Sequence, residues 1–119
     1  MSEYFVINGG KKLEGEIAVG TAKNAALKIL AASILTPRPV KIAKLPEIED
    51  ISRMKELLLD LGVKFFPDGK LDASKIKKTD LNYKIADKFR ASIVLTGPLL
   101  SRFGSVSFPH PGGCTLGKR

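Results

Sequence analysis

The 119-residue chain has one cysteine, no tryptophan and two tyrosines. A single cysteine, Cys114, allows neither an internal disulfide nor a cysteine-rich metal site. The apolar, uncharged run from Ile29 to Pro37 is nine residues long, and the longest uncharged run, 103–117, is fifteen residues long and interrupted by glycine and proline; a membrane-spanning helix needs about twenty apolar residues. No N-terminal stretch combines a basic head, an apolar segment and a small-residue cleavage site. We therefore expect a cytoplasmic protein without a bound metal.

Acidic side chains are scarce toward the C-terminus. Residues 75–119 carry nine Lys and Arg but two Asp, whereas residues 1–74 carry eleven basic and ten acidic side chains. Such an excess of positive charge attracts anions, whether nucleic acid, a membrane surface or phosphorylated metabolites. Because no run alternates aromatic and basic residues, the sequence gives little support for binding single-stranded nucleic acid by stacking.

The hydrophobic fraction of 44% and the charged fraction of 27% are typical of one globular domain. Hydrophobic periodicity predicts helices over 22–35, with Thr21 as N-cap, over 49–61, and over 86–102 with a kink at Gly97-Pro98. Short strands are expected between and before them, at 4–7, 13–19, 40–45, 63–66, 70–73, around Ile76, and at 104–108. The resulting order, β-β-α-β-α-β-β-α-β, predicts an α/β unit with helices packed on one side of a sheet.

The junction before the first predicted helix carries a lysine, Lys23, followed by Asn24. First helical turns ordinarily favour Asp and Glu, because the helix dipole places positive charge there. A lysine in this position completes an anion site with the free N–H groups of the helix. The alternative is an ordinary solvated lysine. The Walker pattern of phosphate-binding loops is missing.

Cys114 lies between glycines, close to Lys118 and Arg119. Glycines favour a mobile, exposed loop, and nearby cations lower the pKa of a thiol. The pattern therefore favours a reactive cysteine over a buried structural one. His110 is the only histidine available as a partner, so a Cys-His hydrolase is an alternative, although no Asn or Asp is clearly placed to orient the ring.

Arg90 precedes the apolar residues Ala91, Ile93 and Val94. Its guanidinium is therefore expected at the edge of a packed face. A solvated surface arginine is the alternative explanation.

Three segments of the chain resemble UDP-N-acetylglucosamine enolpyruvyl transferases. They are Gly15 to Leu27 with Lys23-Asn24, then Arg90 to Gly104, then Pro111-Gly112-Gly113-Cys114-Thr115-Leu116-Gly117-Lys118-Arg119. The resemblance covers essentially the whole chain in order. The related shikimate-phosphate enolpyruvyl transferases share the fold but lack the cysteine loop, so Cys114 favours the UDP-sugar family.

The resemblance implies transfer of the enolpyruvyl group of phosphoenolpyruvate to the 3′-hydroxyl of UDP-N-acetylglucosamine, by addition and elimination, in the first committed step of peptidoglycan synthesis. It implies that Cys114 is the general acid and the residue that fosfomycin alkylates. It also implies that Lys23, Asn24, Arg90 and Arg119 bind the substrates, and that no metal or organic cofactor takes part. Two polyanionic substrates would account for the basic C-terminal part without nucleic acid or membrane.

The resemblance further implies a βαβαββ-type unit of an inside-out α/β barrel. Residues 22–119 match the first such unit, and residues 1–21 match strands that pack with a second domain. We therefore expect a fragment that is inactive alone, and that self-associates or pairs with the rest of the enzyme. No carboxylate in the chain looks placed as a general base.

Val94 stands where many family members have tryptophan, so any role of that side chain is lost.

A different class of function is also considered: a small basic module that binds nucleic acid or another polyanion and no longer uses the transferase site. Its binding would weaken steeply with salt and would not depend on Cys114.

Overall fold

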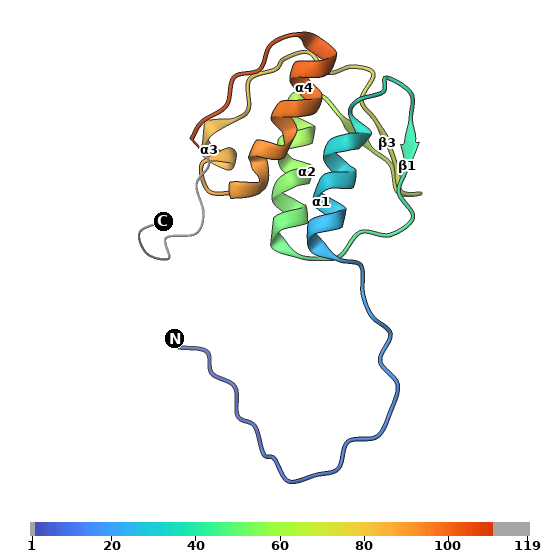
Figure 1. Cartoon of the computed structure of the whole chain (residues 1–119), viewed down its shortest axis with the longest axis vertical. Coiled ribbons are helices and arrows are strands. Elements are labelled where there is room, and N and C mark those ends of the chain that lie inside the picture. The colour runs from blue at the N-terminus through green and yellow to red at the C-terminus, as the bar shows by residue number, and fades with distance from the viewer. Residues whose placement is uncertain (1, 111–119) are drawn as a thin grey trace.

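The computed structural model describes residues 2–110, and its helices form the centre of the molecule (Figure 1). Helices α1 (Lys23–Ser33) and α2 (Glu49–Leu61) lie side by side and run in the same direction. A 3₁₀ helix, η1 (Arg90–Leu95), contacts both and continues into α4 (Thr96–Phe103), which also runs the same way. The starts of α1, α2 and η1 therefore share one end of the molecule.

Helix α2 forms where the sequence predicts it. Its buried residues, Ile51, Met54, Leu57, Leu58 and Leu61, recur at helical spacing on one face. The helix ends at Gly62, which has a left-handed φ of 109°. A Cβ atom there would lie 2.6 Å from the carbonyl oxygen of Lys75, so the site excludes a side chain for two reasons.

Helix α1 also forms as predicted, but its predicted cap is wrong. The N-cap residue is Ala22 rather than Thr21, and no side chain caps the helix. Apolar residues occur around much of α1: Leu27 and Leu30 are buried, whereas Ile29 is half exposed.

The sheet is small and antiparallel. Within the described residues its order is β1 (Val40–Lys41), β3 (Lys70–Asp72), β2 (Lys64–Phe65). The strands predicted at 63–66 and 70–73 form the β2–β3 hairpin, and Gly69 at the end of its turn has a positive φ of 84°, which glycine adopts readily. The predicted strand 40–45 shortens to two residues, while Figure 1 shows the helices gathered on one side of the sheet, as an α/β unit requires.

The predicted helix over 86–102 is wrong in its first half. A short helix, α3 (Tyr83–Ala86), comes first, and Phe89 then adopts an extended conformation with its ring buried. The chain re-enters helix as η1, and Pro98 falls in the first turn of α4, where proline is tolerated. The strands expected around Ile76 and over 104–108 are replaced by one bridge, between Asp80 and Ser107.

Residues 2–21 form an extended arm without the two strands predicted there. The apolar side chains of the arm, such as Phe5 at 98% exposure, lie in solvent. Alternating sequence gives a strand only where another strand satisfies its backbone groups, and no described residue does so for the arm.

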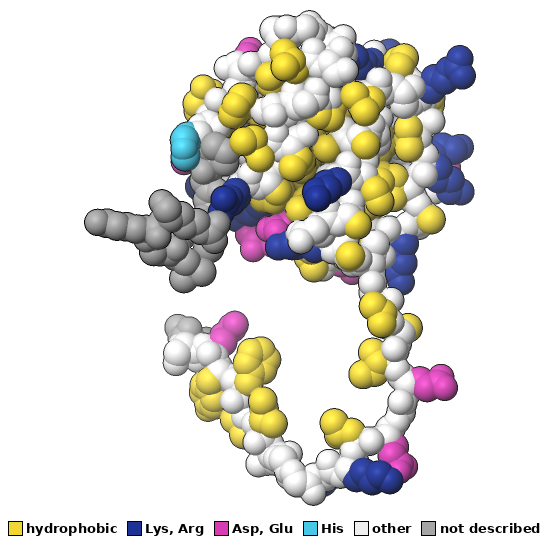
Figure 2. All heavy atoms as spheres, viewed as in Figure 1, with side chains coloured by type: hydrophobic (Ala, Val, Ile, Leu, Met, Phe, Trp, Pro, Cys, Tyr) yellow, Lys and Arg dark blue, Asp and Glu magenta, His cyan; other side chains and the backbone are white. Residues whose placement is uncertain are grey.

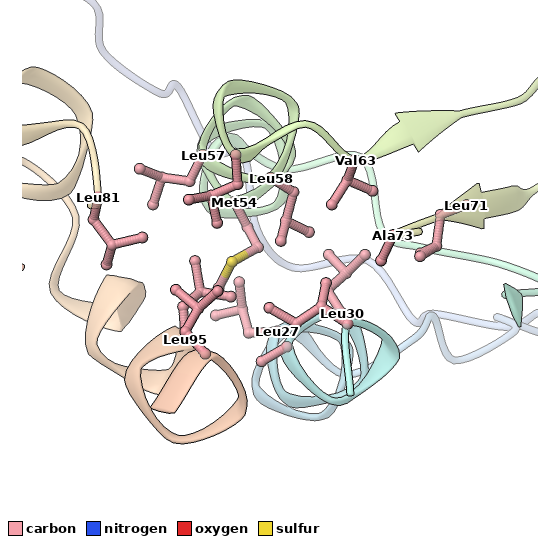
Figure 3. Close-up of a cluster of buried hydrophobic side chains, with 14 of the residues drawn as sticks. Leu27, Leu30, Met54, Leu57, Leu58, Val63, Leu71, Ala73, Leu81 and Leu95 are labelled. Carbon is pink, nitrogen blue, oxygen red and sulfur yellow. The ribbon is translucent and has the colours of Figure 1, made fainter. Parts of the chain in front are cut away.

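One core joins the helices to the sheet (Figure 3). Leu27 and Leu30 of α1 meet Met54 and Leu58 of α2, and Leu71 of β3 closes the cluster on the sheet side. On its border, the Arg102 guanidinium donates hydrogen bonds to the carbonyl oxygens of Ile34 (3.0 Å) and Ala73 (2.9 Å). No helix in the described part of the chain is long and apolar enough to cross a membrane.

Candidate functional site

A hollow of about 470 Å³ opens at the end of the molecule where α1, α2 and η1 begin. It is lined by Lys23 and Asn24 from the first turn of α1, by Asp50 from α2, and by Lys88 and Arg90 around the start of η1. Figure 2 shows basic and acidic side chains together at this end of the body. The fold thus brings together three residues that the sequence singles out: Lys23, Asn24 and Arg90.

Lys23 is held by an ion pair. Its Nζ lies 2.8 Å from Oδ2 of Asp50, and both side chains are partly exposed. Helix α1 has no acidic residue in its first turn, whereas α2 has Glu49 and Asp50 there. The counter-charge that α1 lacks is therefore supplied by the neighbouring helix. An ammonium has three donors, so Lys23 keeps donors for an anion while it contacts Asp50.

Asn24 and Arg90 are both exposed at the hollow. Leu27 and Phe89 also line the hollow, and because both are buried they fix the two backbone segments against the core. Arg90 forms no ion pair with any residue of the described range. The hollow can therefore bind an anion between the amide of Asn24 and the cations of Lys23 and Arg90.

Two predicted site residues, Cys114 and Arg119, lie outside the described residues. His110 is at the end of the described range and is exposed. The Cys-His pairing considered above depends on Cys114 and therefore also lies outside the described residues. Among residues 2–110 no group of His, Cys, Asp and Glu is arranged to hold a metal ion.

Asp50 and Lys88 are lining residues that the sequence did not single out. In the sequence, Asp50 resembles any acidic residue in a first helical turn, where the helix dipole alone explains a negative charge. Lys88 is one of several lysines in a lysine-rich stretch. The signal that could have identified Asp50 is the absence of an acidic residue in the first turn of α1. A lysine at that position needs a counter-ion from another element.

The resolved pKa shifts belong to groups away from the hollow. A hydrogen bond from Arg53 to Glu49 raises the pKa of the arginine. Hydrogen bonds from Lys70 lower the pKa of Asp68, and those from Ser74 lower the pKa of Asp72. These shifts concern the surface of α2 and the hairpin, and they do not mark a second reactive centre.

Comparison with known proteins identifies a family and similar solved structures. Residues 7–119 match the family of EPSP synthase (3-phosphoshikimate 1-carboxyvinyltransferase). The fold is similar to the crystal structure of the enolpyruvyl transferase NikO from Streptomyces tendae, with a TM-score of 0.66 and 25% sequence identity over 81% of this chain. The matched region spans 23% of the NikO chain.

Proposed function

This chain belongs to the EPSP synthase family of enolpyruvyl transferases, and we propose that it is the N-terminal part of a UDP-N-acetylglucosamine enolpyruvyl transferase of peptidoglycan synthesis. The observation that carries the proposal is the convergence of Lys23, Asn24 and Arg90 on one hollow. These are the residues that the resemblance assigns to substrate binding, and they come from segments far apart in the sequence.

In this reaction both substrates are anionic. Phosphoenolpyruvate brings a carboxylate and a phosphate, and the nucleotide sugar brings a diphosphate. Lys23 and Arg90 would neutralise negative charge on these substrate groups, while Asn24 supplies an oriented amide. Because the cations are held by helices packed on a common core, they need little rearrangement when the substrate binds.

The covalent steps are an addition and an elimination. The Cys114 thiol would donate a proton to the methylene carbon of phosphoenolpyruvate, while the sugar 3′-oxygen passes its proton to a base beyond this unit and bonds to the adjacent carbon. Elimination would then return a proton from the new methyl group to the Cys114 thiolate and expel phosphate, leaving the enolpyruvyl ether. These steps need proton transfer and anion stabilisation, and no electron carrier.

The choice of UDP-N-acetylglucosamine over a shikimate phosphate is supported by the Gly112-Gly113-Cys114 segment of the sequence. NMR titration of the labelled chain tests this choice, with the Lys23, Asn24 and Arg90 amides as reporters. We expect UDP-N-acetylglucosamine to shift these signals at concentrations where shikimate 3-phosphate does not. The reverse order would overturn the proposed acceptor.

A mass measurement tests the role of Cys114. The purified chain is incubated with fosfomycin, with and without UDP-N-acetylglucosamine, and a single adduct at Cys114 is expected. Cys114→Ser is the matched control and should gain no mass. An adduct at a basic or histidine side chain instead would contradict the assigned thiol chemistry.

The cytoplasmic location and any pairing with the rest of an enzyme are part of this proposal. The matched region covers under a quarter of the NikO chain, so complete turnover would draw on groups beyond this unit. A nucleic-acid-binding module would behave differently, since its affinity would fall steeply with added salt and would not change in Cys114→Ser.

A further inference from the structure

Lys88 lines the same hollow as Lys23 and Arg90, although neither the motifs nor the resemblance assigns it a role. It precedes Phe89, and Arg90 follows. Asp87, Lys88 and Phe89 form the connection between α3 and η1, and Arg90 is the first residue of η1.

The backbone at Phe89 places its two neighbours on a common side. Phe89 is extended, with φ −138° and ψ 97°, and its ring is buried in the core at 3% exposure. Side chains on either side of an extended residue point away from that residue's own side chain. Burial of the Phe89 ring thus turns Lys88 and Arg90 outward together, and both are exposed at the hollow.

The charges of the hollow are unevenly compensated. Lys23 has Asp50 at 2.8 Å. Neither Lys88 nor Arg90 forms an ion pair within residues 2–110, although Asp87 adjoins them in sequence. The wall formed at the start of η1 is therefore more positive than the wall formed by α1, and it offers a second position for an anion.

We propose that Lys88 is a further binding residue, which joins Arg90 in contacting the diphosphate of a nucleotide-sugar substrate. This inference rests on the proposed function and names a binding residue in addition to those the family motifs supply. Two cations about two strand steps apart, roughly 7 Å along the backbone, suit a ligand with two linked phosphates. The partly neutralised wall at Lys23 suits the smaller substrate.

The test compares two glutamine variants by NMR titration of the full chain. Lys88→Gln removes the proposed contact. Lys77→Gln removes the same charge near the opposite end of α2, where its backbone N–H donates to the Leu61 carbonyl oxygen. Each variant is titrated with UDP and, separately, with phosphoenolpyruvate.

We expect Lys88→Gln to weaken UDP binding by about threefold to fivefold, the effect of one exposed charge contact, and to change phosphoenolpyruvate binding by less than about twofold. Lys77→Gln should leave both unchanged. Equal weakening of UDP binding in the two variants, or unchanged UDP binding in Lys88→Gln, overturns the role of Lys88 but leaves the proposed function. Failure of the unmodified chain to bind either ligand at millimolar concentration overturns both.

Discussion

Lys23 and Asp50 join the first turns of α1 and α2 through an ion pair of 2.8 Å at the mouth of the hollow. The pair ties the candidate site to the packing of the two helices, because a change in either side chain alters both the local charge and the contact between the helix ends.

A double-mutant cycle measures this pair. Lys23→Gln, Asp50→Asn and the double variant should show a coupling of about 0.2–1 kcal/mol in the free energy of unfolding, as is usual for partly exposed pairs. Replacing Asp50 also removes its favourable interaction with the α2 dipole. This loss is the same with and without Lys23, so it cancels in the coupling energy. The matched control is the Lys12–Glu14 pair of the arm, which has the same 2.8 Å separation but more exposed side chains. Its coupling should be near zero, and equal couplings would contradict the expectation.

Leu58→Ala tests the core. Leu58 is fully buried in α2, whereas Leu59, the next residue, is half exposed. Truncation of Leu58 should cost about 2–5 kcal/mol, and Leu59→Ala should cost less than about 1 kcal/mol. Urea denaturation measures both. Similar losses in the two variants would place the core elsewhere.

Gly62→Ala should destabilise the chain by about 1–3 kcal/mol. The alanine would adopt a left-handed conformation with its Cβ against the Lys75 carbonyl oxygen. Gly20→Ala is the control, since a Cβ there meets no atom within 4 Å and the residue does not have a left-handed φ. That variant should leave the midpoint of thermal unfolding unchanged. A higher midpoint for Gly62→Ala would disprove the predicted strain.

Acid should weaken the hairpin. Hydrogen bonds from the Lys70 backbone and side chain lower the pKa of Asp68 in the folded chain. The unfolded state then binds more protons than the folded state below about pH 4, so stability falls as the pH decreases through that range. In Asp68→Asn, the free energy of unfolding should fall less steeply with decreasing pH, and asparagine keeps the turn because Asn-Gly also suits it. Urea denaturation at a series of pH values between pH 5 and about pH 2 measures this dependence. The same pH dependence in the variant and the unmodified chain would contradict the prediction.

Removal of residues 2–21 should leave the stability of the remaining body unchanged. The arm residues make no backbone hydrogen bonds to the described body, and the apolar side chains of the arm are exposed. Denaturation midpoints of the full and shortened chains should agree. A lower midpoint for the shortened chain would mean that the arm packs on the body in solution.

Local signals account for the parts of the fold that the sequence predicted well. Helix α2 has a clear apolar stripe and Gly62 at its end, and the hairpin has Asp68-Gly69. Such features determine the local backbone conformation within a few residues, so they can be recognised from the sequence alone. The strands expected in the arm failed because alternation shows only that a strand would be half buried, not that a partner is present.

The break at Phe89 was missed for a related reason. Its ring reaches the core only if the backbone leaves the helical path, and that requirement comes from tertiary packing. The same break positions Arg90 and Lys88. The resemblance singled out Lys23, Asn24 and Arg90, which line one hollow, whereas Asp50 and Lys88 emerged only when separate segments were placed side by side.

Arg102 has a consequence for the order of folding. Its guanidinium supplies a donor to carbonyl oxygens that precede it by 68 residues at Ile34 and by 29 residues at Ala73. During synthesis, α1 and β3 are translated before this donor is made. Contacts of such sequence separation form slowly, because a long loop must close first. Helix α4 therefore packs last onto the rest of this unit, and a nascent chain shorter than 102 residues should remain sensitive to proteolysis.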